Sequence, residues 1–342
     1  MKEKKISNIT DLASLLNLSV STISRVLNGK ADKFRISQAT QQRILQAAEQ
    51  YQYKPNIIAR GLKLDRTETL GLIVPDIADP FFAEIAKSIE KEAKTRGYML
   101  ILCDSNNSID TEKELLNLLH SRRVDGLVIA PIGTDFSHIM DIYSAGLALV
   151  VVDRIPKQEK IPSVSSDNYT GAFEAVSYLV AMGHQRIACI CGNRDVQPVV
   201  DRLQGYMDAL KKHNIPFDSE LVSGSSFSTT TGNTELKKLF ALKNKPTAIF
   251  ALNSLIGLGV LKAASEIHIK IPDDLSVISF DEQAYSPFLS PPMTTIEQNK
   301  QGIGTKAIDT LLKHIENPDY KTIAIEKLPV LFRARESVKK IS

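Results

Sequence analysis

The sequence predicts an α/β protein in which a small, basic, all-helical module precedes a large domain built on doubly wound parallel sheets. The first observation is a partition of charge. Residues 1–66 hold twelve lysines and arginines against five aspartates and glutamates, a net +7, whereas the rest of the chain holds thirty against thirty-four, a net −4. The second is that short apolar runs alternate with amphipathic stretches from Thr69 onward, as in parallel α/β sheets. A basic module beside an acidic domain is typical of a protein that binds a polyanion with one part only.

Length and composition fit two or three domains with sizeable cores, because the chain has 342 residues of which 43% are hydrophobic. On charge alone, a solvated basic tail is the alternative. Cys189 and Cys191 alternate in "IACICG" and so share one face of a strand, which is not metal-site spacing. No apolar run approaches the roughly 20 residues of a membrane helix, and the first residues lack the apolar core of a secretory signal. We therefore expect a cytoplasmic protein.

Two short helices are predicted in "SNITDLASLLNLSVSTISRVLNGK". Asn8 can cap the first, where Asp11 favours the helix dipole, and Asn17 can adopt the left-handed conformation that ends it. Ser19 is placed to cap the second helix. The predicted inward faces consist of Leu12, Leu15 and Leu16 in the first helix, Ile23, Val26 and Leu27 in the second, and Ile44, Ala47 and Ala48 in a third helix capped by Ser37.

The outward face of the second helix has the chemistry of a DNA-reading surface. Short polar residues begin it and Arg25 follows one turn later; in the major groove Arg pairs bidentately with guanine, and Ser bonds to several base edges. Two helices joined by a short turn often mean no more than packing, but the positive charge favours a helix-turn-helix. We expect the DNA-contacting residues of this module to be Ser19, Val20, Ser21, Thr22, Ser24, Arg25 and Asn28.

Seven apolar runs of strand length are predicted in the large domain: "LGLIVP", "YMLILCD", "DGLVIAP", "LALVVVD", "RIACICG", "TAIFAL" and "LSVISF". Ligands of such sheets bind beyond the carboxyl ends of the strands, so the residues after each run are candidates for a site. Polar and aromatic residues recur there: Asp79, Phe81 and Phe82 after the first run, Asp153 and Arg154 after the fourth, Asn253 after the sixth and Asp281 after the seventh.

Each of these side chains could by itself be a cap or a turn former, but their recurrence favours a binding site. Neighbouring hydroxyl groups of a sugar both donate and accept hydrogen bonds, and so match Asp together with Arg or Asn. The apolar faces of a sugar ring match aromatic side chains. The set therefore predicts a site for a polyol.

The segment "ITDLASLLNLSVSTISRVLNG", followed by "YKPNIIARGLK", resembles the DNA-binding headpiece and hinge of the lactose-repressor/galactose-repressor family of bacterial transcription regulators. The resemblance covers nearly the whole chain, through "GLIVPDIADPFFAEIAKSIE", "RRVDGLVIAP", "GAFEAVSYLVAMGHQRIACICG", "RLQGYMDAL", "IPDDLSVISFDE" and the terminal "RARES". Two departures are visible. Asn17 stands where the family's turn usually has Gly, and "KADKFRIS" is a longer loop than usual, which leaves the start of the third helix less defined.

The resemblance implies a domain order: a headpiece at residues 1–55, a hinge helix or linker at 56–66, an effector-binding and dimerisation domain at 67–336 and a tail at 337–342. In the family the hinge becomes helical on operator DNA, and a Leu from each subunit wedges into the minor groove. Leu62 matches that Leu, and Arg60 and Lys63 would lie near the flanking phosphates. The alternative is a flexible linker whose Leu packs on the neighbouring domain.

The resemblance also implies a two-lobed effector domain like sugar-binding proteins of the periplasmic type, with a small sugar or sugar phosphate between the lobes. Asp79 stands where an Asn is frequent in pentose binders, and Ser254 replaces the Asp of a frequent Asn-Asp pair. Phe81 and Phe82 would flank the sugar ring. The residues expected to contact the effector are Asp79, Phe81, Phe82, Asp153, Arg154, Arg202, Asn253, Asp281 and Gln298.

We therefore expect a homodimeric repressor of carbohydrate-metabolism genes that binds pseudo-palindromic operator DNA and has no catalytic residue, metal or cofactor. No leucine heptads end the chain, so a coiled-coil tetramer is not expected. One rival is an enzyme, because "GIGTKA" has dinucleotide-loop spacing, but no buried strand precedes it and its glycines more simply allow close helix packing. The other rival is an exported sugar carrier without DNA function, which would need a signal peptide where the basic module stands.

Overall fold

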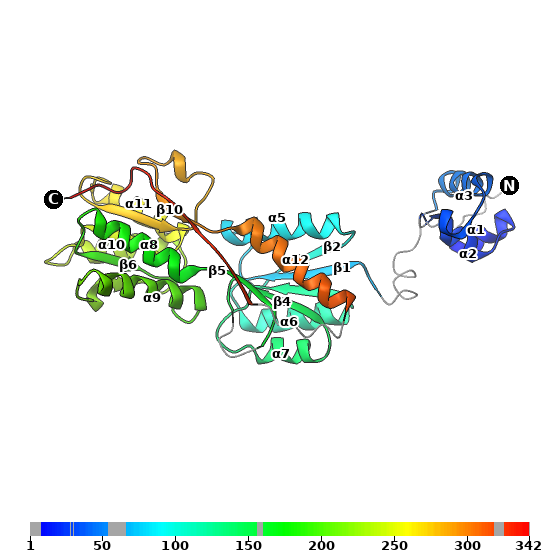
Figure 1. The fold of residues 1–342 in the computed structure, drawn as a ribbon, viewed down its shortest axis with the longest axis horizontal. Helices are drawn as coiled ribbons and strands as arrows, with labels where there is room; N and C mark the ends of the chain where they lie inside the picture. The colour runs from blue at the N-terminus through cyan, green and yellow to red at the C-terminus, as the bar shows by residue number, and fades with distance from the viewer. Residues whose placement is uncertain are drawn as a thin grey trace. The chain divides into compact units, whose positions relative to one another are not determined.

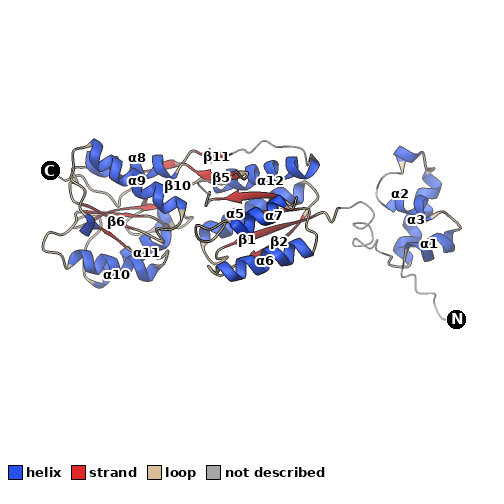
Figure 2. Cartoon of the chain, turned by 90° about the horizontal axis from the view of Figure 1, so that it is seen from below, coloured by secondary structure: helices blue, strands red, loops and turns tan. Residues whose placement is uncertain are grey.

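The computed structural model describes residues 8–27, 29, 31–53, 66–155, 160–317 and 325–341. The chain forms two compact units, Met1–Glu68 and Thr69–Ser342. Of the predicted hinge, residues 56–66, only Arg66 lies within the described residues. Figures 1 and 2 show the helices and strands of each unit, and each unit is described by itself below.

The smaller unit is a three-helix bundle with a short turn between its first two helices. Its elements are α1 (Ile9–Leu16), α2 (Val20–Leu27), the 3-10 turn η1 (Asp32–Phe34) and α3 (Gln38–Gln50). A capping box begins α1, because the Asn8 side chain accepts from Asp11 N at 2.8 Å and the Asp11 carboxylate accepts from Asn8 N at 3.3 Å. Asn17 ends α1 with φ 52° and ψ 46°, and Ser37 caps α3, so both predictions are confirmed.

One predicted core position of this unit is wrong. Leu15 is 46% exposed, and its place in the core is taken by Ala13, which is 5% exposed. The face of α1 that carries Leu12 and Leu16 contacts α2 and α3. On a 3.6-residue helix Ala13 and Leu15 flank this pair on opposite sides, and the other two helices cover the side of Ala13. The helix periodicity was predicted correctly, but the direction of the inward face was not.

The first lobe of the larger unit, the N-terminal lobe, is a six-stranded parallel sheet between two helical layers. Its elements are β1 (Thr69–Val74), α5 (Pro80–Thr95), β2 (Met99–Asp104), α6 (Ile109–Ser121), β3 (Gly126–Ile129), α7 (Ser137–Ser144), β4 (Ala148–Val152), β5 (Ser163–Ser166), α12 (Lys300–Glu316) and β11 (Ile325–Leu328). The strand order is β11-β5-β4-β3-β1-β2. Helices α5 and α12 cover one face of the sheet, and α6 and α7 cover the other.

The second lobe, the C-terminal lobe, repeats this arrangement. Its elements are α8 (Asn168–Ala181), β6 (Ile187–Ile190), α9 (Gln197–Lys212), η2 (Ser219–Leu221), β7 (Val222–Ser223), α10 (Thr229–Phe240), β8 (Ala248–Ala251), α11 (Ser254–Glu266), β9 (Ser276–Phe280), η3 (Ser286–Phe288), β10 (Thr294–Glu297) and β12 (Leu331–Arg333). The strand order is β12-β10-β9-β8-β6-β7, with only the β10–β12 pair antiparallel among the described strands. Helices α8 and α9 cover one face, and α10 and α11 cover the other.

All seven predicted strands are present, as β1, β2, β3, β4, β6, β8 and β9. The "GIGTKA" segment lies inside α12, which packs on α5, and a Cβ atom at Gly304 would lie 2.3 Å from Ser88 Oγ. The prediction that these glycines allow close helix packing is therefore confirmed at Gly304. In the described part of the chain, no helix is both long and apolar enough to cross a membrane.

The described chain passes between the lobes three times. It leaves β5 for α8, returns from β10 to α12, and leaves β11 for β12. Figure 1 shows α12 returning to lie along α5 in the N-terminal lobe. Because parallel strands point their carboxyl ends at one edge of each sheet, this topology brings the strand ends of both lobes toward the region of the crossings.

Candidate functional site

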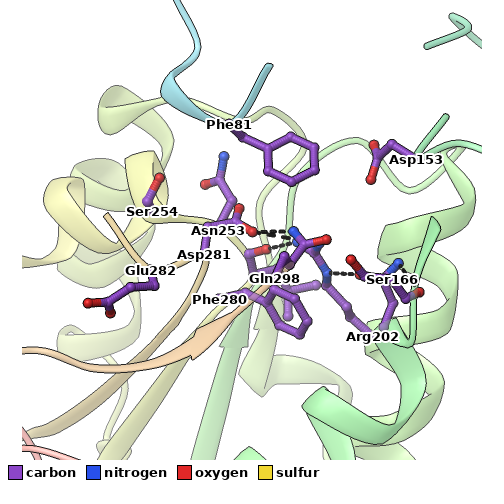
Figure 3. A network of polar contacts seen from close by, with 12 residues as sticks. Phe81, Asp153, Ser166, Arg202, Asn253, Ser254, Phe280, Asp281, Glu282 and Gln298 are labelled. Carbon is purple, nitrogen blue, oxygen red and sulfur yellow. Dashed lines mark hydrogen bonds and ion pairs between the residues drawn. The ribbon is translucent and has the colours of Figure 1, made fainter. Parts of the chain in front are cut away.

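One cavity between the lobes is lined by all nine residues that the sequence predicts for effector binding, and its volume is about 40 Å³. We call it the interlobe pocket, and Figure 3 shows part of its polar network. The nine residues are Asp79, Phe81 and Phe82 at the start of α5, Asp153 and Arg154 after β4, Arg202 in α9, Asn253 after β8, Asp281 after β9 and Gln298 after β10.

Three further residues line the pocket, and the sequence did not predict them: Val196, Pro198 and Phe227. Val196 and Pro198 stand at the start of α9, just beyond β6, so the rule about strand ends could have found them. Phe227 follows β7, a strand of only two residues that carries no readable periodicity. Together with Phe81 and Phe82, these residues give the pocket an apolar part of its lining.

Two aspartates of the pocket have left-handed backbone conformations. Asp153 has a φ of 64° and Asp281 a φ of 71°, and each directly follows a strand, β4 and β9 respectively. This region is sparsely populated by residues other than glycine, and backbone strain of this kind concentrates at functional sites. The same turn in both lobes places a carboxyl group in the interlobe pocket.

Arg202 is buried and held on several sides. Its Nε donates to Asn168 Oδ1 at 2.8 Å and its Nη1 donates to the Leu252 carbonyl, while Nη2 lies 3.9 Å from Asp281 Oδ1. The guanidinium carbon lies 3.6 Å from the centroid of the Phe280 ring. Arg202 therefore ties α8 and α9 to the ends of β8 and β9, and many of its donor groups are used within the protein (Figure 3).

Arg154, in the N-terminal lobe, is held by contacts within that lobe. Its Nη1 donates to the Pro131 carbonyl at 3.0 Å, and its Nε lies 3.9 Å from Asp153 Oδ2. Glu112, whose side chain is fully buried, accepts from the next backbone amide, Ile132 N, at 2.9 Å and contacts His138 Nε2 at 2.7 Å. Glu112 thus fixes the loop that orients Arg154.

Within the described residues, two buried acceptor atoms in the pocket have no hydrogen-bond partner: Asp153 Oδ1 and Gln298 Oε1. The amide of Gln298 instead donates through Nε2 to Asp281 Oδ1. Burial raises the pKa of Asp153 and lowers the pKa of Arg154 and of Arg202, because each charged form loses its hydration. A ligand that donates hydrogen bonds would satisfy the two free acceptors.

Asp79 is a buried carboxyl group whose pKa is raised, mainly by burial. Burial raises its pKa to about 6; the hydrogen bond from Phe81 N, at 2.9 Å, opposes the rise, and the charges of Asp281, Asp76 and Asp153 add to it. The folded protein therefore binds this proton more tightly than the unfolded chain does. The stabilisation that results is present at low pH and is lost as the pH rises through about 6.

We expect Asp79→Asn to stabilise the larger unit by about 1–2 kcal/mol at pH 7.5, with the gain shrinking as the pH falls from 6 toward 4. Asn is as good a helix cap as Asp, so the start of α5 should be preserved. The measurement is thermal unfolding of both proteins over this pH range, followed by circular dichroism. A gain that does not depend on pH would show that the ionisation of buried Asp79 is not its cause.

The predicted DNA-contacting residues lie along the start and outward side of α2. Val20, Ser21 and Arg25 are exposed, while Thr22 and Ser24 are partly buried. Ser19 caps the helix, because its Oγ accepts from Thr22 N at 3.1 Å. The predicted contacts Asn28, Arg60, Leu62 and Lys63 lie outside the described residues.

Phe34 is a neighbour of this surface that sequence reasoning missed. It belongs to the longer loop "KADKFRIS", is 42% exposed, and has its ring centroid 3.9 Å from the guanidinium carbon of Arg25. An exposed cation–π contact of this kind is worth about 0.5–1 kcal/mol. The unusual loop therefore restrains Arg25, the side chain expected to read a base.

A helix-turn-helix unit joined to a two-lobed domain with a polar interlobe pocket defines a ligand-controlled DNA-binding protein. Residues 8–56 match the family described as "Bacterial regulatory proteins, lacI family", and residues 67–335 match "Periplasmic binding proteins and sugar binding domain of LacI family". The chain belongs to the LacI family of bacterial transcription regulators. It is a DNA-binding regulator with a sugar-binding domain, which the sequence predicted, and not an enzyme.

Similar proteins support this assignment along the whole chain. The HTH-type transcriptional repressor CytR of Escherichia coli K12 is 33% identical over 92% of each chain. The lac repressor dimer bound to operator has the same fold, with a TM-score of 0.87 and 24% identity over 98% of this chain and 100% of that one. A complex of the transcriptional regulator CelR with cellobiose has a TM-score of 0.74 and 27% identity over 97% of this chain and 100% of that one.

Proposed function

We propose that this protein is a cytoplasmic, homodimeric repressor of carbohydrate-metabolism genes, whose affinity for its operator is set by a small sugar in the interlobe pocket. Residues 1–55 would bind the operator half-site, residues 56–66 would form the hinge and residues 67–336 would bind the effector and the second subunit. The observation that carries the proposal is the pocket itself: charged, amide and aromatic side chains from both lobes line one cavity. The CelR–cellobiose complex supports a sugar as the class of ligand.

The size of the pocket supports a role in switching. At about 40 Å³ it is far smaller than the roughly 300–1,000 Å³ of typical small-molecule sites, so a sugar can enter only if the lobes move apart. The three chain crossings between the lobes are where such a hinge motion would take place. A ligand that changes the spacing of the lobes changes the operator affinity, and by linkage the operator changes the ligand affinity by the same factor.

The test begins with an operator selected from random duplexes by the full-length protein. Gel shifts on that operator, with and without each member of a panel of pentoses and hexoses, should identify a sugar that changes the binding midpoint by about 5- to 150-fold. The same sugar should raise the melting temperature of the DNA-free protein. Selection that yields no common sequence would contradict the DNA-binding half of the proposal, and a panel with no active sugar would contradict the effector half.

A further inference from the structure

The interlobe pocket carries an excess of negative charge. Three carboxyl groups line it, from Asp79, Asp153 and Asp281, against the two guanidinium groups of Arg154 and Arg202. Carboxylates outside the pocket add to this negative charge. The charge of Asp76 contributes to the pKa of Asp79, that of Glu112 to the pKa of Arg154 and that of Asp201 to the pKa of Arg202. The pKa of Asp79 is raised mainly by burial, and the charges of Asp281, Asp76 and Asp153 add to the rise. This electrostatic environment disfavours a further negative charge.

The two arginines supply less positive charge to a ligand than their presence suggests. Arg202 donates to Asn168 and to the Leu252 carbonyl and faces Asp281, and Arg154 donates to the Pro131 carbonyl beside Asp153. Each guanidinium is thus paired with a carboxylate and with backbone or amide oxygens. A phosphate group binds best to arginines whose paired donors are free for bidentate contact.

The helix N-termini at the pocket, which could otherwise hold a phosphate, already have some of their amides bonded within the protein. The Asp79 carboxylate accepts from Phe81 N at the start of α5, and Asn253 Oδ1 accepts from Ile256 N at the start of α11. The third such helix, α9, has Pro198 in its first turn, and its next two amides, of Val199 and Val200, donate to the Val196 carbonyl at 3.1 and 3.3 Å.

We propose that the effector of this protein is an uncharged, hydroxyl-rich molecule and that the interlobe pocket excludes its phosphorylated forms. This inference rests on the proposed function, and it chooses between the free and phosphorylated sugars that the sequence left open. Hydroxyl groups would donate to the unpartnered Asp153 Oδ1 and Gln298 Oε1, and the aromatic wall of Phe81, Phe82 and Phe227 would cover the apolar faces of the ring. An ionised phosphate group cannot donate hydrogen bonds to these acceptors as a hydroxyl group does, and it would be repelled by the carboxylates of the pocket.

The test compares matched pairs on the full-length protein: ribose with ribose 5-phosphate, and glucose, fructose and galactose with their phosphate esters. Dissociation constants are measured by calorimetry, and inorganic phosphate is titrated separately by thermal shift. One unbalanced charge at about 6 Å in an effective dielectric of about 20 corresponds to a factor of about 100. We therefore expect the free sugar of the active pair to bind at least about 100-fold more tightly than its ester. Inorganic phosphate at roughly 10 mM should leave the melting temperature unchanged.

An ester that binds as tightly as its free sugar would overturn the inference while leaving the proposed function intact. The same holds for stabilisation by inorganic phosphate that Arg154→Gln abolishes. If no sugar of either kind binds, the sugar effector of the proposed function is wrong, and the phosphate titration still decides whether the pocket accepts anions.

A pair of variants assigns the discrimination to the carboxylates. Asp79→Asn removes the excess negative charge but keeps the helix cap, and should reduce the ratio of the two dissociation constants by up to about 100-fold. Asp110→Asn removes an exposed carboxylate at the start of α6 in the same lobe and should leave the ratio unchanged. Equal effects of the two variants, or none from Asp79→Asn, would contradict the role assigned to the pocket carboxylates.

Discussion

Replacing Arg202 by alanine should lower the free energy of unfolding of the larger unit by about 3–5 kcal/mol. The side chain is 3% exposed and bonds to Asn168 and the Leu252 carbonyl while facing Asp281 and the Phe280 ring. Its removal leaves the Asp281 carboxylate buried with only the Gln298 amide as a described partner, and it opens a cavity beside Phe280. The response to the effector should be lost together with this stability.

Arg186→Ala is the matched control, because Arg186 lies in the same lobe and also pairs with a carboxylate, that of Asp218, at 2.9 Å. Both of these side chains are about one-third exposed, so this pair should contribute no more than about 1 kcal/mol. The chain has no tryptophan, so urea unfolding is best followed by circular dichroism. A loss below about 1 kcal/mol for Arg202→Ala would show that Arg202 contributes to ligand binding alone.

Two simple rules acting together predicted seven of the nine pocket residues. Apolar runs located the strands, and the carboxyl ends of parallel strands meet at one edge, so Asp153 after β4, Asn253 after β8 and Asp281 after β9 converge without any knowledge of contacts. The same rule would have found Val196 after β6. Arg202 lies inside α9, and Gln298 follows β10, which is not one of the seven predicted strands. These two residues were predicted from the family resemblance.

Other features could not be predicted because they depend on tertiary contacts. β5 has the sequence Ser163–Ser166, which reads as a loop, yet it is buried because Ser163 Oγ donates to the Ile161 carbonyl and Ser165 Oγ to the Asp153 carbonyl. The hydrogen bonds of Arg202 to Asn168 and to the Leu252 carbonyl could not be predicted from the sequence either. The exposure of Leu15 followed from which side of α1 meets the other two helices, a choice that periodicity alone leaves open.

Replacing Arg25 by alanine should weaken binding to the selected operator by about 1–3 kcal/mol, a factor of roughly 5 to 150, and relax the preference at one base pair in each half-site. Arg25 is exposed on α2, one turn beyond Ser21, where a side chain of a recognition helix can reach base edges. Binding to random DNA should fall much less, because non-specific affinity comes from phosphate contacts. Equal losses on both kinds of DNA, with a shallower salt dependence, would identify Arg25 as a phosphate contact instead.

Phe34 allows the role of Arg25 to be separated from that of its support. The ring lies 3.9 Å from the Arg25 guanidinium carbon, so Phe34→Ala should cost up to about 0.5–1 kcal/mol of operator affinity by freeing that side chain. In the Arg25→Ala background the same substitution should cost almost nothing, because the group that Phe34 restrains is gone, and a double-mutant cycle on the operator measures the difference. A Phe34→Ala loss of the same size in both backgrounds would mean that the ring contacts DNA by itself.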